Sequence, residues 1–216
     1  MSIPKISKTV SIILNYVLLK TFKKELIFFS TTIFSIVCIY SQSNKNFTTL
    51  KIKPSLTDST ITSADAAHFI AYNNNKVQKQ LLVFLPGTNG IPEKGPMQLF
   101  KTAINQGLPV INLSYSNTIA VARICKGENL KNDSECTRKF REKRVFGTNT
   151  TALISDESQD AIVNRLHKLL IYLVKHDSKG NWDSYLNNGA INWKKIIVSG
   201  QSQGGGMAAF IAKKKK

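Results

Sequence analysis

The sequence WKKIIVSGQSQGGGMAAFIA, residues 193–212, joins an apolar segment to a run of small residues through the pentapeptide GQSQG, residues 200–204. The residues before the pentapeptide predict a buried strand, and those after it predict a helix with little side-chain bulk. The pentapeptide has the pattern G-x-S-x-G, in which a serine occupies a sharp turn between a strand and a helix. Gly200 and Gly204 are small where the strand and the helix would crowd together. The stretch therefore predicts an α/β fold with Ser202 at the carboxyl end of a sheet strand.

Earlier apolar runs predict the rest of the sheet. Gln80–Leu85 (QLLVFL) and Leu108–Tyr115 (LPVINLSY) are continuous apolar runs, as expected of buried strands. Between them, Pro96–Gln106 carries apolar residues at helical spacing. This order of strand, helix and strand implies a mostly parallel sheet with right-handed crossovers and flanking helices. Two β-prone pieces, Phe47–Ile52 and His68–Tyr72, are expected to be the first strands.

A polar insertion and a long helix are predicted between Leu108–Tyr115 and the serine stretch. Residues 118–147 are polar and are expected to be helical in parts. Asp156–His176 has an apolar stripe, acidic residues at its start and basic residues at its end. Both the stripe and this order of charges favour a helix. We therefore predict one amphipathic helix whose first turn begins at Asp156.

The N-terminus contains two apolar runs, Val10–Leu19 and Leu26–Tyr40, with lysines before and between them. The second run is short for a bilayer span and matches the core of a signal peptide. Residues 1–43 are therefore predicted to be a signal peptide, and residues 44–216 the mature domain. The predicted location is exported, either periplasmic or secreted. The alternative is a membrane-anchored protein tethered through residues 26–40.

Cysteine usage supports export. Cys38 lies in the apolar run and would leave with it, so that Cys125 and Cys136 remain as an even pair within the insertion 118–147. An even number of cysteines fits an oxidising compartment, and a disulfide here would contribute about 3 kcal/mol by constraining the unfolded chain. The alternative is two unrelated thiols. Ten intervening residues do not match a metal-ligand spacing, and the sequence has no phosphate motif, so we predict no metal and no cofactor.

Composition limits the class of protein further. The chain has 216 residues, of which 42% are hydrophobic, and this excludes a wholly disordered protein. Its formal net charge of +17 first suggests a nucleic-acid partner. The charges are dispersed, however: Lys213–Lys216 form a terminal tail, and the basic residues of segment 138–144 are accompanied by Glu142 and by a single aromatic residue, Phe140. Neither group resembles a binding module in which aromatic residues are interleaved among the basic ones. We therefore interpret the basic residues as solvated surface and predict no nucleic-acid partner.

From about Gln80 to Ala212 the sequence resembles the α/β-hydrolase superfamily of serine esterases and lipases. The resemblance rests on three features in order: QLLVFL with the loop that follows it, LPVINLSY, and the elbow GQSQGG. It implies a serine hydrolase that acts on ester or related acyl bonds, with Ser202 as the nucleophile. The backbone N–H groups of Thr88 and Gln203 would form the oxyanion hole, and the substrate would be a small-molecule or lipid ester.

The catalytic triad implied by this resemblance is incomplete. In that family an Asp or Glu and then a His follow the serine. Only fourteen residues follow Ser202, and none is Asp, Glu or His. We expect His68, His167 and His176 to pack or to lie at the surface. The aspartates are expected to be turn, cap or surface residues: Asp58, Asp65, Asp133, Asp156, Asp160, Asp177 and Asp183.

The family's sheet normally continues after the elbow helix, so residues 44–216 would correspond to the N-terminal two thirds of such a domain. The sequence therefore predicts a C-terminally truncated hydrolase fold that is inactive as it stands, because the Asp and His of the triad are missing. The alternative is a non-catalytic binding protein, secreted or tethered to a membrane, on the same truncated fold.

Overall fold

The structure is a computed structural model that describes residues 47–76, 78 and 80–215. These residues belong to one compact unit, Asn46–Lys216. The predicted signal peptide or anchor, residues 1–43, lies outside the described residues. In the part of the chain that the structure describes, no helix is both long enough and apolar enough to cross a membrane.

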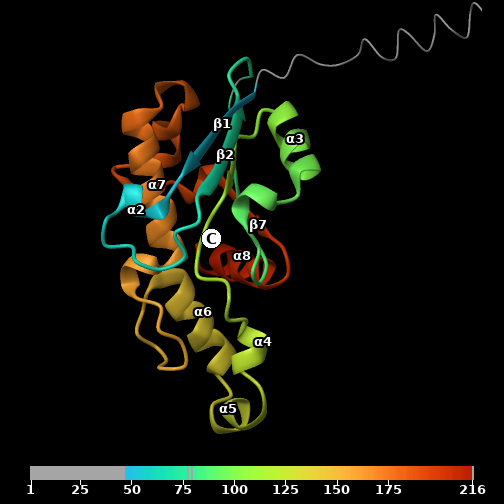
Figure 1. Ribbon diagram of the computed structural model, residues 1–216, viewed down its shortest axis with the longest axis vertical. Helices are drawn as coiled ribbons and strands as arrows, with labels where there is room; N and C mark the ends of the chain where they lie inside the picture. The colour runs from blue at the N-terminus through green and yellow to red at the C-terminus, as the bar shows by residue number, and fades with distance from the viewer. Residues whose placement is uncertain (1–46, 77, 79, 216) are drawn as a thin grey trace, which may run out of the picture. The chain divides into compact units, whose positions relative to one another are not determined.

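The described residues form a five-stranded mixed sheet in the order β1-β2-β4-β3-β7. β1 and β2 are antiparallel, as are β2 and β4, whereas β4, β3 and β7 run parallel (Figure 1). The predicted α/β class with a largely parallel sheet is therefore confirmed, with an antiparallel pair at one edge. The strands are β1 (Phe47–Ile52), β2 (His68–Asn73), β3 (Leu81–Leu85), β4 (Val110–Asn112) and β7 (Ile196–Gly200).

Helices cover both faces of the sheet, because parallel strands need crossover connections. Figure 1 shows α3 and α7 on opposite sides of the sheet. Alternate residues of β3 enter two separate cores: Val83 packs with the α7 side, and Phe84 packs with Phe100 of α3. The helices are α2 (Pro54–Thr57), α3 (Met97–Asn105), α4 (Val121–Ile124), α5 (Gly127–Asn132), α6 (Cys136–Phe146), α7 (Ile162–His176) and α8 (Gln203–Lys214).

The insertion is helical in parts, as predicted, and it contains the predicted disulfide. Cys125 follows α4 and Cys136 begins α6, and their sulfur atoms are 2.01 Å apart with a Cα–Cα distance of 5.6 Å. Both cysteines are buried in the core on the α7 side of the sheet. The bond therefore fixes the start of α6 against α4.

A short hairpin between α7 and β7 was not predicted. It consists of β5 (Leu186–Asn187) and β6 (Ala190–Ile191), which are antiparallel. The two residues of its turn, Asn188 and Gly189, have φ of 49° and 77°. Asn-Gly is the dipeptide that such tight turns favour, so the sequence did carry this signal.

The long helix begins later than predicted. α7 starts at Ile162, whereas Asp156 lies in an irregular segment and Asp160 ends a short 3₁₀ helix, Ser158–Asp160. The prediction that Asp156 opens the helix is wrong, because both carboxylates are committed to buried arginines. Asp156 accepts two hydrogen bonds from Arg144, at 2.6 and 3.1 Å, and Asp160 accepts one from Arg165 at 2.6 Å.

These ion pairs also correct two predictions about exposure. The side chain of Arg144 is 1% exposed and that of Asp156 is 7% exposed, while the corresponding values for Arg165 and Asp160 are 0% and 3%. Neither aspartate is a surface residue, and Arg144 is not part of the solvated basic surface. In each pair the arginine donates charge-assisted hydrogen bonds to the aspartate carboxylate, as burial of a charge requires.

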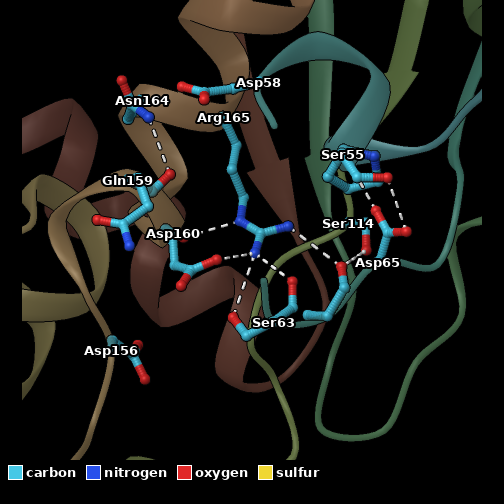
Figure 2. A network of polar contacts seen from close by, with 12 residues as sticks. Ser55, Asp58, Ser63, Asp65, Ser114, Asp156, Gln159, Asp160, Asn164 and Arg165 are labelled. Carbon is cyan, nitrogen blue, oxygen red and sulfur yellow. Dashed lines mark hydrogen bonds and ion pairs between the residues drawn. The ribbon is translucent and has the colours of Figure 1, made fainter. Parts of the chain in front are cut away.

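Arg165 also connects α7 to the segment that precedes β2. Figure 2 shows its guanidinium between Asp160 on one side and Ser63 on the other. Nη2 donates to the Ser63 carbonyl at 2.6 Å, and Nη1 donates to the Ala64 carbonyl at 3.1 Å. The Ala64 carbonyl also accepts from Ser114 Oγ, directly beyond β4. The network therefore holds a loop at the carboxyl end of the parallel strands.

His68 lies close to this network and is fully buried. Its Nδ1 accepts a hydrogen bond from the backbone N–H of Ser114 at 2.9 Å. Burial, with the positive charge of Arg165, lowers the pKa of His68 to about 3. His68 is therefore neutral at physiological pH and serves the packing of β2 against β4, as predicted.

The pKa of His68 makes stability depend on pH. Below pH 6.5 the unfolded chain binds a proton at His68 that the folded chain excludes until about pH 3, so stability falls as the pH falls through this window. We expect a loss of up to about 1.4 kcal/mol of unfolding free energy per pH unit between pH 6.5 and 4.5. Urea unfolding at a series of pH values measures this slope. His68→Asn should flatten it, and the exposed His176→Asn should retain it; equal slopes in both variants would refute the assignment.

Candidate active site

Ser202 occupies a sharp turn between β7 and α8. Its φ of 50° and ψ of −118° lie in a region that residues with a side chain rarely adopt. Such a conformation costs about 1–3 kcal/mol and persists only where the surrounding structure imposes it. The turn is closed by the backbone N–H of Gly204, which donates to the Gln201 carbonyl at 2.8 Å. Ser202 itself is exposed.

Gly200 and Gly204 supply the space that this turn needs. A Cβ atom on Gly204 would lie 2.0 Å from the Leu85 carbonyl oxygen, and one on Gly200 would lie 2.5 Å from the carbonyl carbon of Gly204. Both distances are far below van der Waals contact. The end of β3, the end of β7 and the start of α8 therefore approach backbone to backbone, and only glycine fits at these two positions.

The loop after β3 lies directly against the serine. A Cβ atom on Gly87 would be 3.4 Å from Ser202 Cβ and 3.2 Å from the Gln201 carbonyl oxygen. The backbone N–H of Gln201 donates to the Leu85 carbonyl at 3.1 Å. The predicted residue Thr88 directly follows Gly87, so it lies one residue from this contact with Ser202.

The sheet topology also favours a ligand at this point. The helix that follows β3, α3, covers one face of the sheet, whereas α8, which follows the neighbouring strand β7, packs on the other face. The two connections therefore diverge above the carboxyl ends of adjacent parallel strands. Open α/β sheets bind their ligands at such a switch point.

Two N–H groups beside Ser202 are available to a ligand. Gln203 is the first residue of α8, where helix amides have no acceptor within the helix. Among the described residues, no acceptor takes the backbone N–H of Gln203 or that of Thr88. Both amides lie in segments that contact Ser202, so they can donate to an oxygen atom held there.

Side chains that sequence analysis did not single out fix these segments. Asn117 Nδ2 donates to the carbonyls of Gly87 and Gly90, at 2.8 and 2.9 Å. Gln203 accepts from the Val121 N–H through Oε1 at 3.0 Å and donates to the Asn117 carbonyl through Nε2 at 3.2 Å. Asn117 therefore connects the loop after β3 to the residue that follows the serine. The sequence signal for this role is limited to an asparagine two residues beyond the apolar run Leu108–Tyr115.

Tyr115 adds a further fixed contact to the loop. Its hydroxyl donates to the Pro86 carbonyl at 2.7 Å. Burial raises the pKa of Tyr115 to about 12, so the hydroxyl keeps its proton and remains a donor throughout the physiological range. The loop after β3 is therefore held by both Tyr115 and Asn117.

No histidine reaches Ser202. All three histidines of the chain lie among the described residues. His68 is buried and accepts a hydrogen bond from the Ser114 N–H. His167 Nε2 lies 2.6 Å from the Gly189 carbonyl oxygen, and the ring of His176 stacks on that of Tyr172 with 4.2 Å between the ring centroids. The described part of the chain also has no group of three His, Cys, Asp or Glu residues that could hold a metal ion.

A hollow of about 420 Å³ on the described surface is lined by Asn89 and Gly90 of the loop and by residues 114–118 beyond β4. A larger one of about 670 Å³ is lined by residues of α7 and by Trp193 and Lys215, and it includes no residue of the serine turn. The smaller hollow does not include a residue of the serine turn either, but it shares the loop that contacts Ser202, so it is the candidate substrate pocket.

The described residues thus form a mixed α/β protein that presents a serine on a strained turn between a parallel strand and a helix. No family model, no curated protein and no solved structure matches the chain. The functional assignment therefore depends on the geometry of this turn and its surroundings.

The glycine contacts predict a strong effect of one methyl group. Gly204→Ala should lower the free energy of unfolding by about 3 kcal/mol or more, because the Leu85 carbonyl is backbone and cannot move away cheaply. Gly206→Ala is the matched control on the same helix, since a Cβ there meets the end of the Arg141 side chain at 3.2 Å rather than backbone. It should change stability by no more than about 1 kcal/mol. Similar urea midpoints for the two variants would contradict the backbone contact.

Proposed function

We propose that this protein is a serine hydrolase of the α/β-hydrolase type that acts on ester or related acyl bonds through Ser202. The observation that carries the proposal is the strained conformation of Ser202 between β7 and α8, with no room for a side chain at Gly200 or Gly204. Strain of this kind is retained at functional sites. The position of the serine at the divergence of β3 and β7 supports the same assignment.

The proposed chemistry is acyl transfer. Ser202 Oγ attacks the carbonyl carbon of the ester, and the N–H groups of Thr88 and Gln203 donate to the oxyanion of the tetrahedral intermediate. The N-terminal end of α8 adds its positive dipole. Collapse of the intermediate expels the alcohol and leaves an acyl-serine, which water then hydrolyses. The substrate is a small-molecule or lipid ester.

Serine needs a base to accept its proton, and none of the three histidines contacts Ser202. Acylation by this chain alone is therefore expected to be slow, because the oxyanion donors act without a general base. This observation also favours a second candidate function, a non-catalytic binding protein on the same fold.

Export, with anchoring as the alternative, is part of the proposal, and the disulfide is compatible with it.

Labelling with a fluorophosphonate distinguishes the two functions. We expect mass spectrometry to find a phosphonyl adduct on Ser202 that forms slowly, and at least about tenfold faster when imidazole is added as a diffusible base. Ser202→Ala should abolish the adduct, and Ser199→Ala, on β7, should leave it unchanged. If Ser202 is not labelled with or without imidazole, the hydrolase assignment is wrong and the binding function is favoured.

A further inference from the structure

Arg141, on α6 of the insertion, lies against the first turn of α8. Its Nη2 would be 3.2 Å and its Nε 3.7 Å from a Cβ atom on Gly206. The backbone N–H of Gly206 donates to the Ser202 carbonyl at 3.2 Å. Four residues of helix span about 6 Å, so the guanidinium lies about one helical turn from the serine. The absence of a side chain at Gly206 leaves room for it.

The charge of Arg141 is not used within the described part of the chain. Arg141 forms no hydrogen bond or ion pair there, and its Nε is buried without an acceptor. Arg141 differs in this from other basic residues of α6, which form ion pairs: Arg138 with Glu135, Lys139 with Asp133 and Arg144 with Asp156. The adjacent acid, Glu142, faces Lys214 at 3.5 Å. Among the residues that the structure describes, the Arg141 guanidinium therefore has no partner, and it lies next to the serine turn.

The surroundings of Arg141 favour an anion. The N-terminal turn of a helix carries a partial positive charge, so a second positive charge beside it is unfavourable unless an anion is present. Guanidinium binds carboxylates through two parallel hydrogen bonds. A single guanidinium balances one negative charge, which is the charge of a carboxylate.

We propose that Arg141 determines substrate specificity by binding a carboxylate of the ester substrate, about one helical turn from the carbonyl that Ser202 attacks. This inference rests on the proposed function of Ser202. It assigns the substrate class as acyl esters with a free carboxylate, and it gives the polar insertion a role in recognition.

The test compares two activated esters of the same acyl length, mono-p-nitrophenyl succinate and p-nitrophenyl butyrate, in the presence of imidazole. Mass spectrometry measures the rate of Ser202 acylation by each. The wild-type chain should be acylated by the succinate at least about tenfold faster, the effect expected of one charge-assisted contact. Arg141→Gln should reduce this preference to about one with the butyrate rate unchanged, and Arg141→Lys should retain part of it.

Arg138→Gln is the matched control, because it removes the same charge from α6 at an exposed ion pair. It should retain the preference, which separates a local contact from the general attraction of a basic protein for anions. The inference about Arg141 would be overturned if both esters acylated the wild type equally, or if Arg141→Gln slowed acylation by both esters to the same extent. In either case, acylation of Ser202 would still uphold the proposed function. Failure of both esters to acylate Ser202 would overturn the proposed function itself.

Discussion

The approach of Gly204 to the Leu85 carbonyl is the constraint on which the site depends. A methyl group at Gly204 would be 2.0 Å from that oxygen, so the start of α8 can reach the ends of β3 and β7 only without a side chain there. Because α8 starts so close to the end of β3, the chain must turn sharply between the end of β7 at Gly200 and the start of α8 at Gln203. Ser202 absorbs this reversal at a φ of 50°, and its side chain stays exposed.

The elements around the turn hold in place the two segments that carry the N–H groups of Thr88 and Gln203. The loop after β3 is fixed by Tyr115 and Asn117, and Gln203 connects the helix to the same segment beyond β4. Fixed donors cost little reorganisation during a reaction, which is the basis of oxyanion stabilisation. The insertion contributes Arg144 as a buried structural residue, whereas Arg141, one turn earlier on the same helix, has no ion pair with any residue that the structure describes.

Much of the sheet was predictable from the sequence, because its information is local. Leu81–Leu85 is apolar throughout and was identified as a strand buried on both faces, and the cysteine pair of the insertion is a disulfide as predicted. The start of α7 was not predictable from charge order, because Asp156 pairs with an arginine twelve residues earlier rather than capping the helix. The role of Asn117 depends on contacts with Gly87, thirty residues away, and no periodicity records such a contact.

The central claim is that backbone crowding between β3 and α8 forces Ser202 into a strained turn. A crystal structure of the chain at a resolution that defines the backbone dihedral angles measures this directly. The account predicts a positive φ at Ser202, with its Cβ against Gly87 and Gly204 in contact with the Leu85 carbonyl. A Ser202 with negative φ in a relaxed turn, or a side-chain-sized gap between Gly204 and Leu85, would contradict it.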